Sequence, residues 1–209
     1  FRKQTAEQLL KEVRFDAIRG NISEIKTLAS LCGTQEKNSG NMAVSDTMDV
    51  EKITDKSDHC GKITGIDGSG RGVDADNADT VTEENLAQHI SNAKMLSKKL
   101  QTIVAITGAI DLVTDGSSCY VIRNGNPQMG HVTGAGCQLS GILTAFLAAN
   151  PENKLQAAAA AVCMMGYAGE LAAEKSGQSG SGTYRVSLMD AVSCMDGDIL
   201  ERGARYEIR

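Results

Sequence analysis

Residues 131–141 carry the strongest chemical signal in this sequence. Gly134 and Gly136 leave the backbone free to turn, and an alanine-rich segment follows them directly. A helix that begins after such glycines presents its first unpaired amide N–H groups to an incoming anion. Cys137 falls in the first turn of that helix, where the helix dipole favours a thiolate. The pattern predicts a site that holds a phosphate while a neighbouring group is activated.

The same stretch has a structural interpretation that stays open. Tight packing of the helix would also require glycine, and a lone cysteine is usually a small core residue. His131 is more typical of a structural histidine than of a catalytic partner for Cys137.

Arg19, Asn21 and Glu24 form a second candidate group, at a predicted strand-to-helix junction. Ligands gather at the carboxyl ends of strands in open α/β sheets. Arg19 is suited to pair with a phosphate, and Asn21 and Glu24 are spaced to organise Mg²⁺ and its waters. Alternatively, Asn21 caps the helix and Glu24 completes a capping box, and the local sequence alone favours this structural role.

Two further turns are candidates for contact with a nucleotide. Thr107-Gly108 follows an apolar run, so the Thr107 hydroxyl is available to a phosphate, although the local sequence alone favours a plain strand-end turn. Residues 72–74 (Gly-Val-Asp) have the same two interpretations. The pair His59-Cys60 lacks the second pair of ligands that a metal site needs.

The elements that must position these residues alternate between helix and strand. Helices are expected over 4–12, 23–31, 79–100, 137–149 and 153–175, and strands over 13–18, 102–107, 112–114 and 119–123, the last two forming a hairpin. A final strand–helix pair is expected over 183–195. The expected residues at helix starts are Thr5, Asp79 or Thr82, and Pro151. Residues 102–107 form a continuous apolar run, which indicates burial on both faces of a sheet in an α/β fold.

Composition limits the function classes. The chain of 209 residues can bury a sizeable core, and its net charge of −5 without a Lys/Arg cluster argues against a nucleic-acid partner. The sequence shows no secretory signal, and no apolar run approaches the roughly 20 residues of a membrane span. Six scattered cysteines without metal-ligand spacing fit reduced cytosolic thiols. Residues 33–71 are polar and are interpreted as an insertion, with short strands at 49–53 and 61–66.

Taken together, the motifs resemble hydroxyethylthiazole kinase, a thiamine-salvage family of the ribokinase-like superfamily. The matching segments are, in order, residues 1–2 with the helix that follows, 15–25, 72–74, 104–108 and 132–137. In that superfamily the residue after Gly-Ala-Gly is usually Asp, which is taken to be the base. A cysteine there, as at Cys137, is a mark of the thiazole kinases and separates them from hydroxymethylpyrimidine and pyridoxal kinases.

The resemblance implies a ribokinase-like α/β fold, with a central, mostly parallel sheet flanked by helices on both faces. It implies transfer of the ATP γ-phosphate, with Mg²⁺, to the primary hydroxyl of 4-methyl-5-(2-hydroxyethyl)thiazole. The roles implied by matching positions are ATP contact for Arg19 and Thr107, metal and phosphate placement for Asn21 and Glu24, substrate contact for Gly134, the position of the base for Cys137, and an anion hole for the amides of Gly134, Ala135, Gly136 and Cys137.

The resemblance further implies a homotrimer with acceptor sites between subunits, and together with the composition it leads us to expect a cytoplasmic protein with no membrane or nucleic-acid partner. It covers nearly the whole chain apart from 33–71, but the family's early strands and most of its thiazole pocket precede the position that matches Phe1. We therefore expect residues 1–209 to form the C-terminal portion of a kinase domain that phosphorylates poorly alone. The alternatives are another vitamin-precursor kinase of the superfamily, a non-catalytic nucleotide-binding remnant, and a cysteine-based redox or metal module.

Overall fold

The computed structural model describes residues 2–33 and 80–209, and the side chains from residue 4 onward within them. Several sequence features lie outside these residues, namely most of the polar insertion with its two expected strands, the pair His59-Cys60, residues 72–74 and Asp79.

A five-stranded sheet forms the centre of the described part, in the order β1-β2-β3-β4-β5. The strands are β1 (Ala17–Gly20), β2 (Ile103–Ile106), β3 (Asp111–Thr114), β4 (Cys119–Ile122) and β5 (Tyr206–Ile208). Strand β1 pairs with β2 in parallel, whereas the other three pairings are antiparallel. The described sheet is therefore mixed and not mostly parallel. The loops at 107–110 and 115–118 are too short for the crossover that a parallel pairing needs.

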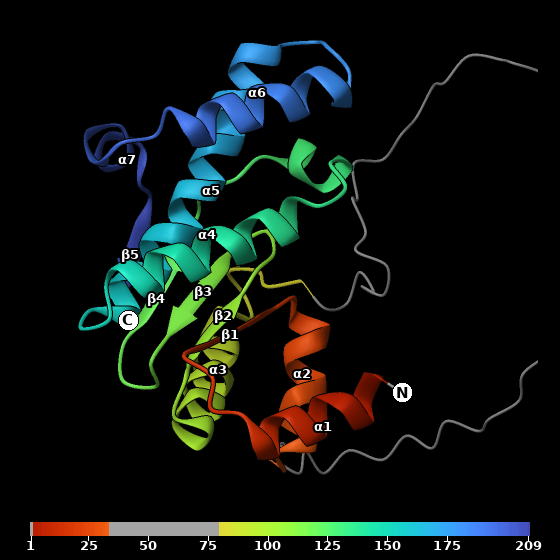
Figure 1. Ribbon diagram of the computed structural model, residues 1–209, viewed down its shortest axis with the longest axis vertical. Coiled ribbons are helices and arrows are strands. Elements are labelled where there is room, and N and C mark those ends of the chain that lie inside the picture. The colour runs from red at the N-terminus through yellow and green to blue at the C-terminus, as the bar shows by residue number, and fades with distance from the viewer. Residues whose placement is uncertain (1, 34–79) are drawn as a thin grey trace, which may run out of the picture.

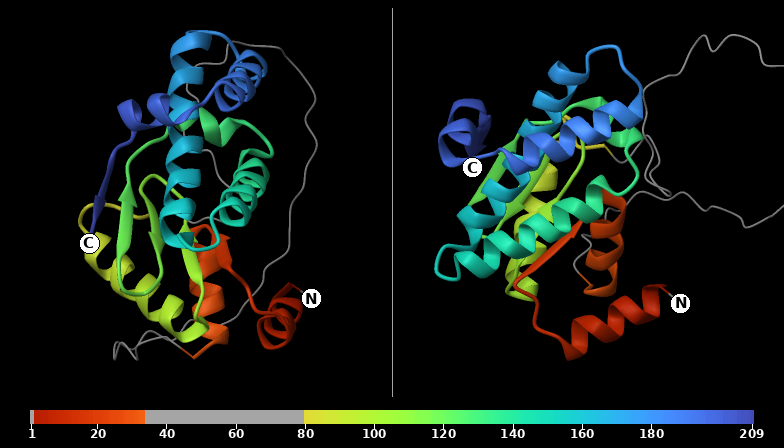
Figure 2. Two further views of the ribbon diagram at one scale, coloured as in Figure 1. Left: turned by 60° about the vertical axis from the view of Figure 1, so that its left-hand side comes forward. Right: turned by 45° about the horizontal axis from the view of Figure 1, so that its top comes forward.

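Helices cover both faces of this sheet (Figures 1 and 2). They are α1 (Arg2–Glu12), α2 (Ile22–Leu31), α3 (Leu86–Leu100), α4 (Ala135–Ala149), α5 (Lys154–Ser176), α6 (Ser181–Ser193) and α7 (Gly197–Gly203), with a short 3₁₀ helix, η2 (Pro127–His131). The α/β architecture and the hairpin of β3 and β4 are confirmed.

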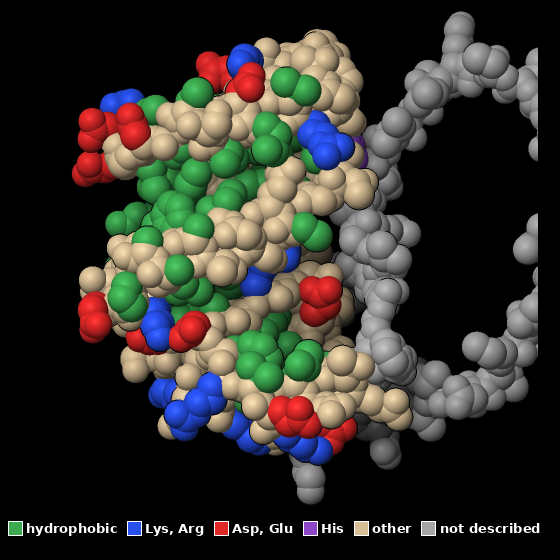
Figure 3. Space-filling view, in the orientation of Figure 1, with side chains coloured by type: hydrophobic (Ala, Val, Ile, Leu, Met, Phe, Trp, Pro, Cys, Tyr) green, Lys and Arg blue, Asp and Glu red, His purple; other side chains and the backbone are tan. Residues whose placement is uncertain are grey.

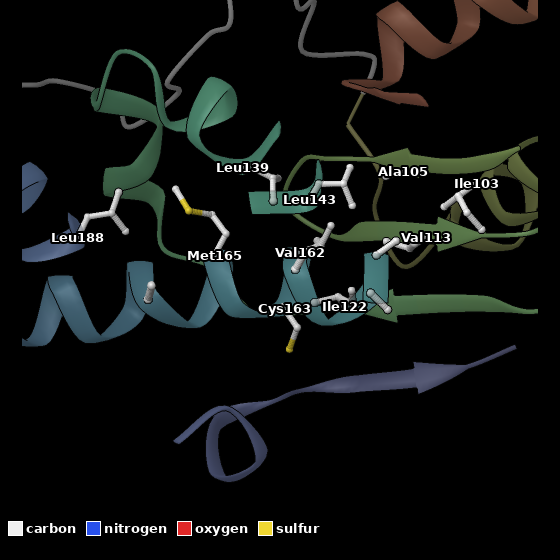
Figure 4. Close-up of a cluster of buried hydrophobic side chains, with 14 of the residues drawn as sticks. Ile103, Ala105, Val113, Ile122, Leu139, Leu143, Val162, Cys163, Met165 and Leu188 are labelled. Atoms are coloured by element: carbon white, nitrogen blue, oxygen red, sulfur yellow. The ribbon is translucent and has the colours of Figure 1, made fainter. Parts of the chain in front are cut away.

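Alternating strand residues fill two separate cores, one on each face. Toward α4, α5 and α6 the strands contribute Ile103, Ala105, Val113 and Ile122 (Figure 4). Toward α2 and α3 they contribute Val104, Ile106, Leu112 and Val121. Because both sets are buried, the continuous apolar run of β2 indeed indicated a strand covered on both faces.

Several element starts differ from the sequence expectation. Helix α1 already begins at Arg2, so Thr5 lies inside it, and β1 begins at Ala17 and not at residue 13. Helix α3 begins at Leu86, because the Asn85 side chain accepts the N–H of Thr82 at 2.8 Å and forms a separate turn before it. Pro151 lies in the loop before α5, which begins at Lys154.

The expected strand–helix pair at 183–195 is wrong, because residues 181–193 form the single helix α6. Tyr184 and Leu188, four residues apart, are buried in the core shared with α5, and the Tyr184 hydroxyl donates to the Gly169 carbonyl at 3.0 Å. This helical spacing explains the apolar residues that suggested a strand. Strand β5, which is only three residues long, was not predicted from the sequence.

Helix α5 has the length and composition of a membrane span, with 23 residues and a mean hydropathy of 1.2 over its apolar window. That window is 67% buried within the protein, between the sheet, α4 and α6. Figure 4 shows its side chains Val162 and Met165 among those of α4, α6 and the strands. The position of α5 as the core helix accounts for its apolar composition.

Candidate functional site

Arg19 brings three distant segments together. Its guanidinium Nη1 donates to the Gly136 carbonyl at 3.1 Å and to Ser140 Oγ at 3.3 Å, both in α4. Its Nη2 donates to Thr107 Oγ1 at 3.2 Å, just after β2. Two predicted ATP contacts, Arg19 and Thr107, thus meet the first turn of α4.

The parallel pairing of β1 and β2 explains this meeting. The Thr107 N–H donates to the Gly20 carbonyl at 3.0 Å, so both strands end at the same edge of the sheet. The sequence placed Arg19 just after the strand, but in the structure Arg19 lies inside β1. Its cross-strand neighbour Ala105 belongs to the core under α4, which places the Arg19 side chain on that face.

The two glycines of the motif have different structural roles. Gly134 is the N-cap of α4 with a positive φ of 93°, a conformation that glycine adopts without strain, and its carbonyl accepts the Gln138 N–H at 2.9 Å. At Gly136, a Cβ atom would lie 3.0 Å from Arg19 Nη2 and 3.3 Å from Nη1. A side chain at position 136 would therefore crowd the guanidinium and require Arg19 to shift by a few tenths of an ångström.

The first turn of α4 presents free amide groups beside this arginine. The Ala135 N–H donates to the Val132 carbonyl at 3.3 Å, whereas the amides of Gly134, Gly136 and Cys137 have no acceptor within the described residues. The structure thus gives one of the four predicted anion-hole amides an internal partner. The remaining N–H groups lie at the positive end of the helix dipole.

The charge of Arg19 is not neutralised by direct pairing. None of the ion pairs among residues 2–33 and 80–209 involves Arg19, and its buried Nε has no hydrogen-bond partner there. All three acceptors of the guanidinium are neutral oxygens. An unpaired guanidinium next to free helix amides is an arrangement suited to a phosphate.

Cys137 lies in the first turn of α4 as a free, exposed thiol. It is therefore accessible to a ligand and does not have the role of a small core residue. His131, exposed at the end of η2, makes no hydrogen bond to Cys137 in the described structure.

Asn21 and Glu24 adopt the structural arrangement that the sequence left as an alternative. Asn21 Oδ1 accepts the Glu24 N–H at 2.8 Å, and Glu24 Oε2 accepts the Asn21 N–H at 2.8 Å, which completes a capping box on α2. Among the described residues, no cluster of three or more His, Cys, Asp or Glu side chains could hold a metal. Glu24 is nevertheless exposed at the start of α2.

Two residues of this site were not predicted. Ser140 Oγ accepts from Arg19 and donates to the Gly136 carbonyl at 3.1 Å. Asp111, the first residue of β3, is buried, and its Oδ1 accepts the Gly108 N–H at 2.8 Å in the turn after Thr107. Burial raises the pKa of Asp111 to about 7, while the Gly108 hydrogen bond and the charge of Arg19 oppose that rise. An acidic residue between Ile110 and Leu112 was the available sequence signal for Asp111.

Two cavities lie away from these residues. One of about 270 Å³ is lined by residues of α1, β1 and the end of α3. The other, of about 540 Å³, lies among β4, β5, α5 and α7, near the apolar side chains that gather between α7 and α4 in Figure 3. None of the predicted site residues lines either of these two cavities. The candidate site lies where the ends of β1 and β2 meet the first turn of α4.

Comparison with known proteins agrees with the resemblance of the motifs. Residues 34–198 match the model of the hydroxyethylthiazole kinase family. The chain is similar to a hydroxyethylthiazole kinase of Clostridium acetobutylicum, with 42% identity over 207 residues, which is 99% of this chain and 63% of that protein. It is also similar to one of Clostridium beijerinckii, with 32% identity over 202 residues, which is 97% of this chain and 59% of that protein.

A solved structure shares the fold. The hydroxyethylthiazole kinase structure from Pyrococcus horikoshii OT3 superposes with a TM-score of 0.69 at 22% identity, and the match covers 100% of this chain and 60% of that one. The chain therefore spans about three fifths of the length of these relatives. The family match over most of its residues shows that the chain belongs to the hydroxyethylthiazole kinase family.

Proposed function

We propose that this chain carries the phosphate-binding machinery of an ATP-dependent kinase whose acceptor is the hydroxyl of 4-methyl-5-(2-hydroxyethyl)thiazole, in thiamine salvage. The observation that supports this proposal most strongly is the position of Arg19. Its guanidinium lies against Gly136 in the first turn of α4 and against Thr107, with no ion-pair partner in the described residues. Family membership supports the thiazole alcohol as the acceptor.

In this proposal the terminal phosphate of ATP binds at the N-terminus of α4. The amides of Gly136 and Cys137 donate to its oxygens, and Arg19 supplies positive charge from the side of β1. Thr107 orients the guanidinium and adds a hydroxyl at the nucleotide side. Phosphoryl transfer depends mainly on such positioning and charge stabilisation, so a fixed guanidinium and fixed amides account for most of the catalysis.

The reaction itself exchanges one bond to phosphorus for another. The acceptor oxygen forms a bond to the γ-phosphorus, the bond from that phosphorus to the bridging oxygen breaks, and ADP leaves. In this proposal Cys137, exposed beside the phosphate site, reacts as the thiolate that the helix dipole favours, so its sulfur takes the proton of the acceptor hydroxyl and becomes a thiol. Gly134, with its positive φ and no side chain, leaves room for the acceptor next to this thiol.

Mg²⁺ is proposed to enter with ATP and to be held through Glu24, with Asn21 beside it. Because Mg²⁺ in nucleotide sites keeps several waters and takes one or two carboxylates plus the phosphates, one exposed carboxylate fits this role. The bound ion would neutralise negative charge on the phosphates. The capping box keeps Glu24 at the start of α2.

The proposal extends to the assembly and the location of the enzyme. We propose a homotrimer with acceptor sites between subunits, on the ground of family membership. We propose a cytoplasmic location because the six scattered cysteines fit reduced thiols.

The test measures nucleotide binding and ADP release by the chain, with the thiazole alcohol, hydroxymethylpyrimidine and pyridoxal as acceptors. We expect ATP to bind and the thiazole alcohol to give the fastest ADP release of the three acceptors, at a low rate because the chain spans about three fifths of its relatives' length. Arg19→Gln should weaken ATP binding by about tenfold or more, since it removes a charge-assisted contact. The matched control, Arg185→Gln on the exposed surface of α6, should leave binding unchanged.

Cys137→Ala separates binding from transfer. The substitution should lower the rate of ADP release while it leaves ATP affinity nearly unchanged, because the amide of residue 137 remains. Nucleotide binding without transfer to any acceptor, even after addition of the N-terminal part that the relatives contain, would favour a non-catalytic protein. A preference for pyridoxal or hydroxymethylpyrimidine would favour another kinase of the superfamily. Unchanged ADP release in Cys137→Ala would remove this thiol from the mechanism.

A further inference from the structure

Asp111 is a buried carboxyl on the same face of the sheet as Arg19. Two positions along β3, Val113 belongs to the core under α4 and α5, so Asp111 points toward that side of the sheet. Arg19 has Ala105 as its cross-strand neighbour, and Ala105 belongs to the same core (Figure 4). Both side chains therefore lie on the face that α4 covers, near the edge where α4 begins.

The hydrogen bond of Asp111 does not explain why this residue is an acid. Its Oδ1 accepts the Gly108 N–H at 2.8 Å, and an asparagine would offer the same acceptor. Asparagine would also avoid the free-energy penalty of burying an ionised carboxylate. The feature that distinguishes Asp111 from asparagine is its charge, and that charge needs a partner.

The charged and titratable groups around Asp111 identify that partner. From β1, the positive charge of Arg19 lowers the pKa of Asp111 against the effect of burial. From α5, the Cys163 thiol has a raised pKa, caused first by burial and in part by Asp111, with Glu170 and Arg205 acting on the same thiol. Burial is the main cause of the raised pKa of Asp111, and the Gly108 hydrogen bond and the charge of Arg19 oppose it. No ion pair in the described structure involves Arg19, so its charge acts on Asp111 from across the same face of the sheet and not by direct contact.

We propose that Asp111 is the charge partner of Arg19 in the empty site and takes up a proton from solvent when a phosphate binds to Arg19. This inference rests on the proposed function, because the phosphate is the ligand that competes for the charge of Arg19. The bound phosphate neutralises the guanidinium and adds negative charge near the carboxylate. The ionised form of Asp111 then loses its stabilisation, and its oxygen gains one proton. Asp111 acts through Arg19 and is therefore a positioning residue.

Calorimetry of a non-hydrolysable ATP analogue binding at pH 7.5, in two buffers with different ionisation enthalpies, tests the proton uptake. The chain should take up more protons per nucleotide than Asp111→Asn, by roughly half a proton and by at most about one. Subtracting the variant removes the analogue's own titration, because both proteins bind the same ligand. Equal proton uptake by two proteins that both bind the analogue would overturn the inference and leave the proposed function intact.

A second measurement tests the charge partnership without nucleotide. Melting temperatures at pH 8 are compared for the unchanged chain, Asp111→Asn, Arg19→Gln and the double variant. We expect Arg19→Gln to lower the melting temperature clearly in the chain that keeps Asp111, and by less than half as much in the Asp111→Asn background. Additive shifts would overturn the partnership. If no form bound nucleotide, the proposed function and the proton uptake would both fail, while this comparison would still decide whether the two charges are coupled.

Discussion

Arg19 and Gly136 depend on each other at the scale of single residues. The guanidinium lies against the backbone of α4, in space that a Cβ at position 136 would enter. Glycine at position 136 therefore lets the positive charge lie against the helix N-terminus without crowding.

Gly136→Ala should weaken ATP binding by up to about tenfold, because its methyl group would lie 3.0 Å from Arg19 Nη2 and push the guanidinium away from the Gly136 carbonyl and Thr107. Alanine also favours the helix, so the protein itself should lose little stability. The control is Gly141→Ala in the same helix, where a Cβ would meet no atom within 4 Å. Titration with a fluorescent ATP analogue measures both variants, and equal affinities would contradict the role of Gly136.

Asp111→Asn should stabilise the protein at neutral pH. The pKa of Asp111 is raised from its ordinary value of 3.8 to about 7 by burial, so the unfolded chain ionises first and stability falls as the pH rises between these values. The asparagine variant lacks this loss. Its free energy of unfolding should exceed that of the unchanged chain by an amount on the order of a few kcal/mol above pH 7, and by little near pH 4. Urea unfolding at several pH values measures the difference, and a pH-independent difference would contradict the burial of an ionisable carboxyl.

The sequence identified the residues of the site that belong to recognisable local motifs. Arg19, Thr107 and Gly136 were named from a strand end and a glycine motif, and the structure brings them into contact. Ser140 and Asp111 were missed, because their connections to Arg19 arise only when distant segments meet in the folded protein.

At the scale of elements, α2 joins the site through its capping box. Asn21 and Glu24 satisfy each other's backbone N–H groups, and this alone would account for both residues. The proposed placement of Mg²⁺ needs in addition the negative charge of Glu24.

Glu24→Gln separates the two roles. Glutamine keeps an acceptor for the Asn21 N–H, as in other capping boxes, so the free energy of unfolding should change by less than about 0.5 kcal/mol. The Mg²⁺ concentration for half-maximal ADP release should rise several-fold, because the carboxylate charge is lost. Asn21→Ala, by contrast, should lower stability by about 1 kcal/mol through loss of the cap. An unchanged Mg²⁺ dependence in Glu24→Gln would leave Glu24 with the capping role alone.

Most elements could be predicted because their patterns are local. The apolar run of β2, the hairpin around 115–118 and the stripe of α3 all appear in the structure. The sheet directions and β5 could not be predicted, since they depend on which strands meet in space. The local sequence of α6 also allowed a strand, and the packing of Tyr184 and Leu188 on α5 stabilises the helix.

At the scale of the whole molecule, Asn124 connects the C-terminal segment to the core. Its side chain is buried, donates to Glu170 Oε1 at 3.1 Å and to the Gly203 carbonyl at 2.9 Å, and accepts the Arg205 N–H at 2.7 Å. These bonds hold β5 and α7 against β4 and α5, away from the residues around Arg19.

Asn124→Ala should lower the free energy of unfolding by about 2–4 kcal/mol, because it removes the three hydrogen bonds of a buried side chain and leaves the Gly203 carbonyl and the Arg205 N–H without these partners. The control is Asn126→Ala, which removes one local hydrogen bond to the Gln128 N–H and should lower stability by only about 1 kcal/mol. Urea unfolding compares the two variants. Similar losses in the free energy of unfolding would show that Asn124 stabilises the protein no more than a local hydrogen bond does. ATP affinity should be unchanged in both variants.

The central claim is that the terminal phosphate of a nucleotide binds between the N-terminus of α4 and Arg19. The most direct test is a crystal structure of the chain with a non-hydrolysable ATP analogue. The account predicts phosphate oxygens within about 3 Å of the Gly136 and Cys137 amide nitrogens, with Arg19 directed to the same group. A terminal phosphate bound elsewhere, with the first turn of α4 contacting only protein atoms, would contradict it.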